Sequence, residues 1–142
     1  MKTLLTLLIL ISGFTVSAQS DKVAGDYALS LPSNQGDVIE YQLTLNEDGS
    51  FVFHYYFNIK HRIPSTANQY GKGTWMVKDN IVLFSADKLK DFDATNTLDF
   101  TGTKARFITK SPRDSSDKLI KTQLRFLKSE ISFMERVGLL QI

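Results

Sequence analysis

The sequence lacks cysteine altogether and has very little histidine. Without cysteine the chain forms no disulfide and no thiolate metal site, and no lipid is expected on an N-terminal cysteine of the mature protein. His54 and His61 are the only histidines, and a zinc or copper site needs more ligands than this pair supplies. We therefore expect neither a metal site nor a cofactor, and a fold stabilised by packing alone.

Long hydrophobic runs are also scarce, and the clearest apolar stretch, 4–11, stands near the N-terminus. It follows Lys2 and precedes Val16-Ser17-Ala18, which is the order of a secretory signal peptide cut after Ala18. The stretch is far shorter than the roughly 20 residues of a membrane-spanning helix, so no transmembrane segment is expected. The sequence predicts a signal peptide over 1–18 and one domain over 19–142, exported to the periplasm or secreted.

The chain as a whole has no strong excess of one charge, because its formal net charge is only +2. A charge this small gives no reason to expect a nucleic-acid partner. The distribution is uneven, however, since residues 104–142 hold nine basic and four acidic side chains. These residues are either ordinary solvated side chains or a cationic face for the anionic lipid or polysaccharide of an envelope. The basic residues of the strands and loop expected there are Lys104, Arg106, Lys110, Arg113, Lys118, Lys121, Arg125 and Lys128.

What the sequence does contain is apolar residues that alternate with polar ones. The stretch 39–45 alternates strictly, which is typical of a half-buried strand. A turn follows at 46–49 and ends in Gly49, so the next strand, 51–59, should run antiparallel to the first. Its odd positions are mostly aromatic, and this aromatic face is expected in the core.

Similar short alternating stretches continue along the chain. Roughly eight strands with short connections and no clear helical segment predict an all-β fold, either an antiparallel up-and-down barrel or a strongly curled sheet. The other expected strands are 27–31, 73–77, 81–84, 98–100, 104–109, 118–127 and 131–137, with a possible helical segment at 86–92. The segments 32–37, 61–69 and 110–117 are rich in polar residues, glycine or proline and should be loops.

Several motifs resemble those of a known group of proteins. Gly25-Asp26-Tyr27 is followed by Leu-Thr-Leu-Asn-Glu-Asp-Gly-Ser-Phe at 43–51, and then by Gly-Thr-Trp at 73–75 ahead of Ile-Val-Leu at 81–83. Over 23–84 this order resembles the small lipocalin-like barrels of the bacterial envelope, and in particular the N-terminal barrels of copper-resistance envelope lipoproteins. The resemblance implies a lipocalin-like barrel. That family has a cysteine pair and a lipidated N-terminus, which this chain lacks, so no copper role is expected.

The aromatic residues of the expected barrel permit two interpretations. They could line a cavity for a small apolar ligand, since an eight-stranded barrel can hold one, or they could simply fill the interior. The candidate ligand-binding residues are Tyr41, Phe53, Tyr55, Phe57 and Trp75.

Catalytic motifs are missing, and no enzyme activity is expected. The chain has no nucleophile elbow, no zinc-protease motif and no paired-glutamate motif. The carboxylates of 91–96 lack the later glycine and glutamate of a calcium loop, so a solvated loop is expected there. Two hypotheses remain: an exported module that binds a small apolar ligand in or at the mouth of the barrel, and a filled-barrel envelope interaction protein that uses its basic C-terminal strands. The packing of the interior should distinguish them.

Overall fold

The computed structural model describes residues 19–142, which form eight strands after a helical turn at 19–23. The signal peptide expected at 1–18 lies outside the described residues. Within 19–142, no helix is long and apolar enough to span a membrane. The strands are β1 (Gly25–Pro32), β2 (Val38–Leu45), β3 (Ser50–Asn58), β4 (Thr66–Lys78), β5 (Ile81–Ser85), β6 (Lys104–Ile108), β7 (Gln123–Lys128) and β8 (Gly138–Gln141).

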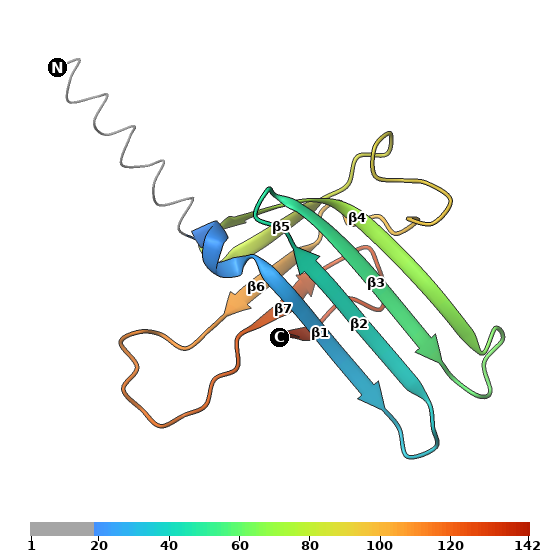
Figure 1. Cartoon of the computed structure of the whole chain (residues 1–142), viewed down its shortest axis with the longest axis horizontal. Coiled ribbons are helices and arrows are strands. Elements are labelled where there is room, and N and C mark those ends of the chain that lie inside the picture. Colours follow the sequence, from blue (N-terminus) through green and yellow to red (C-terminus); the bar gives the residue numbers. More distant parts are fainter. Residues whose placement is uncertain (1–18) are drawn as a thin grey trace.

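The eight strands close into one antiparallel up-and-down barrel, so the expected fold class is confirmed (Figure 1). Each strand pairs with the next in the chain, and β8 returns to pair with β1 at Tyr27 and Ala28. Because the strands alternate in direction, the loops after β1, β3, β5 and β7 lie at one rim, called here the first rim. The loops after β2, β4 and β6 lie at the other rim, called here the second rim. The start of β1 and the end of β8 lie at the second rim as well.

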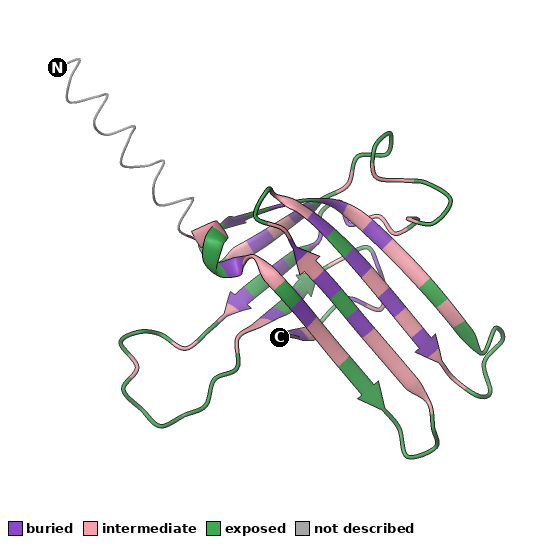
Figure 2. Ribbon diagram, in the orientation of Figure 1, coloured by how far each residue is buried: buried purple, intermediate pink, exposed green. Residues whose placement is uncertain are grey.

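The β2–β3 hairpin forms as its alternation predicts. Tyr41 lies opposite Tyr55, and Leu43 lies opposite Phe53. Odd-numbered residues of β3 are buried, whereas the residues between them are half-buried or exposed, which gives the banded pattern in Figure 2. Burial of the large aromatic side chains supplies much of the stabilisation, at about 25 cal/mol for each Å² of apolar surface removed from water.

Several strand limits differ from the sequence-based expectation. β4 begins at Thr66 rather than near Gly73, because β3 provides a paired partner along the whole stretch of 66–74. The segments 98–100, 118–122 and 131–137 form no strand, and β8 lies after the last of them. The possible helical segment at 86–92 forms no helix.

The barrel is asymmetric, because β1 to β4 are longer than β5 to β8. β8 pairs with β1 only at Tyr27 and Ala28, and β5 pairs with β4 only from Thr74 onward. The first-rim ends of β1 to β4 therefore continue as a four-stranded sheet beyond the closed part, as Figure 1 shows. We call this part the sheet extension.

Candidate functional site

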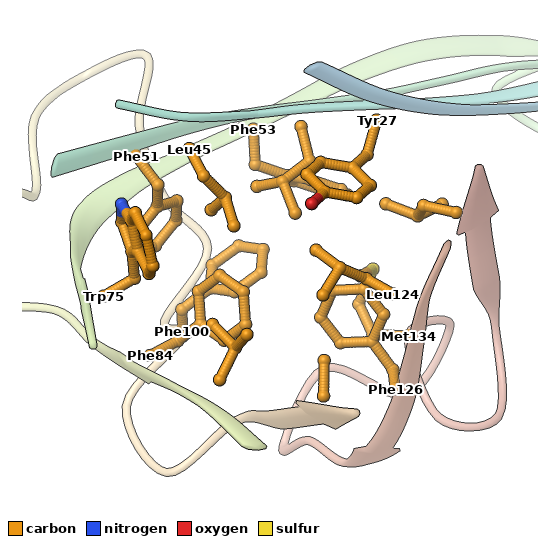
Figure 3. Close-up of a cluster of buried hydrophobic side chains, with 14 of the residues drawn as sticks. Tyr27, Leu45, Phe51, Phe53, Trp75, Phe84, Phe100, Leu124, Phe126 and Met134 are labelled. Atoms are coloured by element: carbon orange, nitrogen blue, oxygen red, sulfur yellow. The ribbon is translucent and has the colours of Figure 1, made fainter. Parts of the chain in front are cut away.

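Aromatic rings from several strands meet in the interior of the barrel (Figure 3). Phe100 lies between Phe51 and Phe53, with ring centroids 5.0 Å from each. Phe84 continues the cluster, with its centroid 5.1 Å from that of Phe51 and 5.7 Å from that of Phe126. These are the separations of rings in direct contact. The aromatic residues therefore pack against one another as a core.

The five candidate ligand-binding residues are all buried, with 2% to 6% of each residue exposed. The structure does not gather them into one site. Tyr41 and Tyr55 contact each other near the first rim, with centroids 5.0 Å apart, and Phe57 follows Tyr55 at 6.0 Å. Phe53 packs on Phe100 in the middle, and the Trp75 indole lies near the second rim, where its Nε1 donates a hydrogen bond to the Asn46 carbonyl. A ligand role for this set stays a prediction.

Three residues that contact this set were missed in the sequence. Phe133 stacks on Tyr55 at 4.1 Å and its carbonyl accepts a hydrogen bond from the Tyr41 hydroxyl. Phe100 reaches the core from the long β5–β6 connection, and the Arg62 guanidinium lies 4.2 Å from the centre of the Phe57 ring. Phe100 and Phe133 stand in stretches that were expected to be strands, 98–100 and 131–137, whereas the structure places all three residues in loops.

Three interior tyrosines, Tyr27, Tyr41 and Tyr55, have raised pKa values. Burial raises the pKa of Tyr41 to about 12, and the neighbouring Tyr55 adds to the shift. Burial also raises the pKa of Tyr27, whose hydroxyl donates to the Val23 carbonyl. The Tyr55 phenol also has a raised pKa, again from burial, although the positive charge of Arg62 acts in the opposite direction. All three phenols are therefore neutral hydrogen-bond donors at neutral pH.

Two hollows open at the surface of the barrel. One, of about 450 Å³, opens at the second rim between the turn at 19–23 and the start of the β6–β7 loop, and Lys22, Thr109 and Ser111 are among its lining residues. The other, of about 360 Å³, lies over the outer face of β2 to β4 beside Asn96. The core residues Val23 and Phe107 also line the first hollow, which therefore lies at the mouth of the barrel.

Basic side chains are paired across β6 and β7. Arg106 lies directly opposite Arg125, and Lys104 lies directly opposite Lys128. All four are exposed, and none forms an ion pair with a carboxylate within residues 19–142. We call these four residues, on the outside of the barrel, the basic face.

The cross-strand neighbours of the basic face on β5 and β8 carry no charge. Ile81 pairs with Arg106 and Leu83 with Lys104, while Gly138 pairs with Arg125 on the other side. The β6–β7 loop extends from the same two strands at the second rim (Figure 1). In it, Leu119 is 86% exposed and stands with the exposed Ile120 between two further basic residues, Lys118 and Lys121.

The histidines and the 91–96 segment have structural partners. His54 stacks on Tyr70 at 4.5 Å, and its Nε2 lies 2.7 Å from the Asn68 Oδ1. Hydrogen bonds from Asn96 and Thr95 hold the pKa of Asp93 well below its usual range. Among the described residues, no group of three or more histidine and carboxylate side chains could hold a metal ion.

Comparison of the chain with known proteins found no matching family model, no matching curated protein and no matching solved structure.

Proposed function

We propose that the protein is a filled β-barrel that binds anionic lipid surfaces through its basic face. The observation that carries the proposal is the register of β6 and β7, which sets Arg106 opposite Arg125 and Lys104 opposite Lys128. Like charges directly opposite each other in a sheet cost stability. An anionic partner offsets this cost, because each lysine or arginine near an anionic membrane contributes about 1 kcal/mol to binding.

Apolar side chains beside the cations favour lipid over polysaccharide. Leu119 and Ile120 are exposed in the β6–β7 loop shortly before β7, and Leu127 is exposed beside Lys128. A lipid interface accepts such side chains among its acyl chains, whereas a hydrated polysaccharide gains little from them. The signal peptide expected at 1–18 would deliver the barrel to the lipid surfaces of the cell envelope.

The packing of the interior supports a function on the outside. The interior rings lie at contact distance from one another. Phe100 contacts Phe51 and Phe53, and Phe84 contacts Phe51 and Phe126. A small apolar ligand in the middle of the barrel would have to displace these rings, which lose dispersion contacts when they separate.

Vesicle binding tests the proposal. The protein should sediment with vesicles of phosphatidylcholine and phosphatidylglycerol, but not with phosphatidylcholine alone, and added salt should release it. Arg106→Glu with Arg125→Glu should weaken binding by roughly tenfold or more. The control is Lys88→Glu with Lys90→Glu, which changes the net charge equally at two exposed lysines of the β5–β6 connection. Equal losses in both double variants, or equal binding to neutral vesicles, would contradict the proposal.

A second pair of variants separates lipid from polysaccharide. Leu119→Ser with Ile120→Ser keeps every charge and should weaken binding to anionic vesicles, with no effect on retention by immobilised dextran sulfate. If these serines leave vesicle binding unchanged while dextran sulfate binds the protein more tightly than vesicles do, the partner is a polyanionic polysaccharide instead of lipid.

A further inference from the structure

The inner face of the sheet extension is largely apolar and only partly covered. Paired residues form two rows across its four strands, in which Gln69 is the one side chain with an amide: Leu29, Tyr41, Tyr55 and Gln69 in one row, and Leu31, Ile39, Phe57 and Ala67 in the next. Phe133 covers the first row by stacking on Tyr55. The second row is covered less completely, since Leu31 remains 48% exposed although it lies on the same face as the buried Tyr27. An apolar wall therefore continues from the closed barrel toward the solvent at the first rim.

The hydroxyl of Tyr55 has no protein partner within the described part of the chain. Tyr55 is only 5% exposed, and a buried tyrosine normally donates its hydroxyl proton to an acceptor. Tyr27 and Tyr41 follow this rule, because they donate to the carbonyls of Val23 and Phe133. Within residues 19–142, every fully buried side-chain polar atom has a partner. The Tyr55 hydroxyl must therefore reach solvent at the first rim as an unused donor.

A free cation lies beside this donor. The Arg62 guanidinium packs on the Phe57 ring at 4.2 Å and forms no ion pair within 19–142. Phe57 is also a neighbour of Tyr55, with ring centroids 6.0 Å apart, so Arg62 and Tyr55 both border the same ring. Stacking on Phe57 holds the guanidinium over the apolar wall, where its N–H groups remain available to an anion.

We propose that Arg62 and Tyr55 form a binding site for the carboxylate of a fatty acid at the first rim of the barrel. The guanidinium and the phenol both donate hydrogen bonds to the carboxylate oxygens. The acyl chain lies along the exposed part of the second row, where Leu31 and Ile39 leave apolar surface open to water. This site lies at the rim opposite the β6–β7 loop and does not depend on the lipid binding proposed for the basic face.

A single anionic head joined to an apolar chain fits this arrangement best. An inorganic anion would use Arg62 and Tyr55 but would leave Leu31 and Ile39 exposed. A neutral or cationic amphiphile would use the apolar wall but would leave the guanidinium unpaired or repel it. The site therefore selects for the combination of charge and chain rather than for either alone.

Isothermal titration calorimetry with decanoate, acetate and decyltrimethylammonium tests the site. Decanoate should bind saturably with one ligand per chain, whereas acetate and the cation should bind at least tenfold more weakly. Arg62→Gln and Tyr55→Phe should each weaken decanoate binding by roughly tenfold, and Leu31→Asn should also weaken it. Both conservative variants keep the stacking of residue 55 on Phe133, so thermal melting should show that they remain folded.

Matched controls lie on other faces of the protein. Tyr56→Phe removes a hydroxyl from the outer face of β3, and Arg113→Gln removes an arginine from the loop at the second rim; neither should affect decanoate binding. The proposal is wrong if decanoate does not bind saturably. It is equally wrong if Arg62→Gln leaves the affinity unchanged, or if decanoate and decyltrimethylammonium bind alike.

Discussion

Single polar atoms fix the orientation of two aromatic rings at the edge of the core. Trp75 and Tyr41 each place a donor at the edge of the apolar interior, and each donates to a backbone carbonyl, at Asn46 and Phe133 respectively. These bonds fix the orientation of the rings and connect the β2–β3 turn and the β7–β8 loop to the core. Replacing Tyr41 removes the bond to the Phe133 carbonyl, whereas the Asn46 carbonyl would keep the bond that it accepts from the Gly49 N–H if Trp75 were replaced.

Tyr41→Phe should change the alkaline stability of the protein. The folded-state pKa of about 12 lies above the value of about 10 for an unfolded chain. The neutral phenol therefore contributes its full stabilisation below pH 10, and this contribution is lost as the pH rises toward 12 because the unfolded chain ionises first. At pH 7 the variant should lose about 0.5–1.5 kcal/mol with the hydrogen bond to Phe133.

Urea unfolding at several pH values between 7 and 12 measures this effect. The free energy of unfolding of the wild-type protein should fall more steeply above pH 10 than that of the Tyr41→Phe variant. Parallel pH profiles would show that Tyr41 does not keep a raised pKa in the folded protein.

At the scale of the element, β4 connects the sheet extension to the closed part of the barrel. Its inward positions 71 and 73 are both glycine, whereas the positions around them carry side chains. A Cβ on Gly73 would lie 2.1 Å from the Ser85 carbonyl oxygen, and one on Gly71 would lie 2.8 Å from the Phe100 ring. The two glycines therefore let a backbone and a ring approach the strand directly.

Gly73→Ala should destabilise the protein more than Gly71→Ala does. At position 73 the neighbour is backbone and cannot move without breaking the β4–β5 pairing, so a loss of about 1–3 kcal/mol or more is expected. At position 71 the Phe100 ring can shift instead. Gly138→Ala is the control, because its Cβ would meet only the end of the flexible Gln123 side chain, 2.9 Å away. Thermal melts that rank these variants differently would contradict the argument.

The β6–β7 pair should be more stable with opposite charges than with its native ones. Arg106→Glu places a carboxylate opposite Arg125, and a cross-strand pair of opposite charges contributes about 0.2–1 kcal/mol. The free energy of unfolding should therefore rise, while binding to anionic vesicles falls. A loss of stability in this variant would mean that Arg106 supports the fold itself, and the proposed role of the basic face would lose its main support.

At the scale of the whole molecule, the barrel depends on its last strand for closure. β8 joins β7 to β1, and the backbone N–H of Ile142 donates to the Asp26 carbonyl at 3.0 Å. Without this strand both β1 and β7 would have free edges, which readily pair with other chains. Leu139, which is fully buried, would also be lost from the core.

A chain that ends at Val137 should therefore aggregate, and its cooperative unfolding transition should disappear. A chain that ends at Gln141 is the control, because it keeps β8 and loses only the exposed Ile142 side chain and one terminal hydrogen bond. Size-exclusion chromatography and thermal melting compare the two. A soluble, cooperatively folded chain without β8 would show that closure is not needed for stability.

The sequence by itself determined the local part of this structure. Alternation over 39–59 predicts the β2–β3 hairpin, its turn at Gly49 and the burial of Phe53 and Tyr55, because side chains of a strand point to opposite faces with a period of two. The same signal repeats often enough to predict an all-β barrel. These features depend on residues that are close together in the chain.

Features that depend on residues far apart in the chain were decided by the tertiary structure alone. Closure through β8, the pairing of Arg106 with Arg125 and the approach of Phe133 and Arg62 to Tyr55 all require particular registers and loop paths. A shift of one residue in a strand moves every side chain to the other face, and a loop carries no periodic signal at all. The sequence indicated the residues of the basic face and Tyr55, but which side chains lie opposite or beside them was decided only when the strands and loops were placed together.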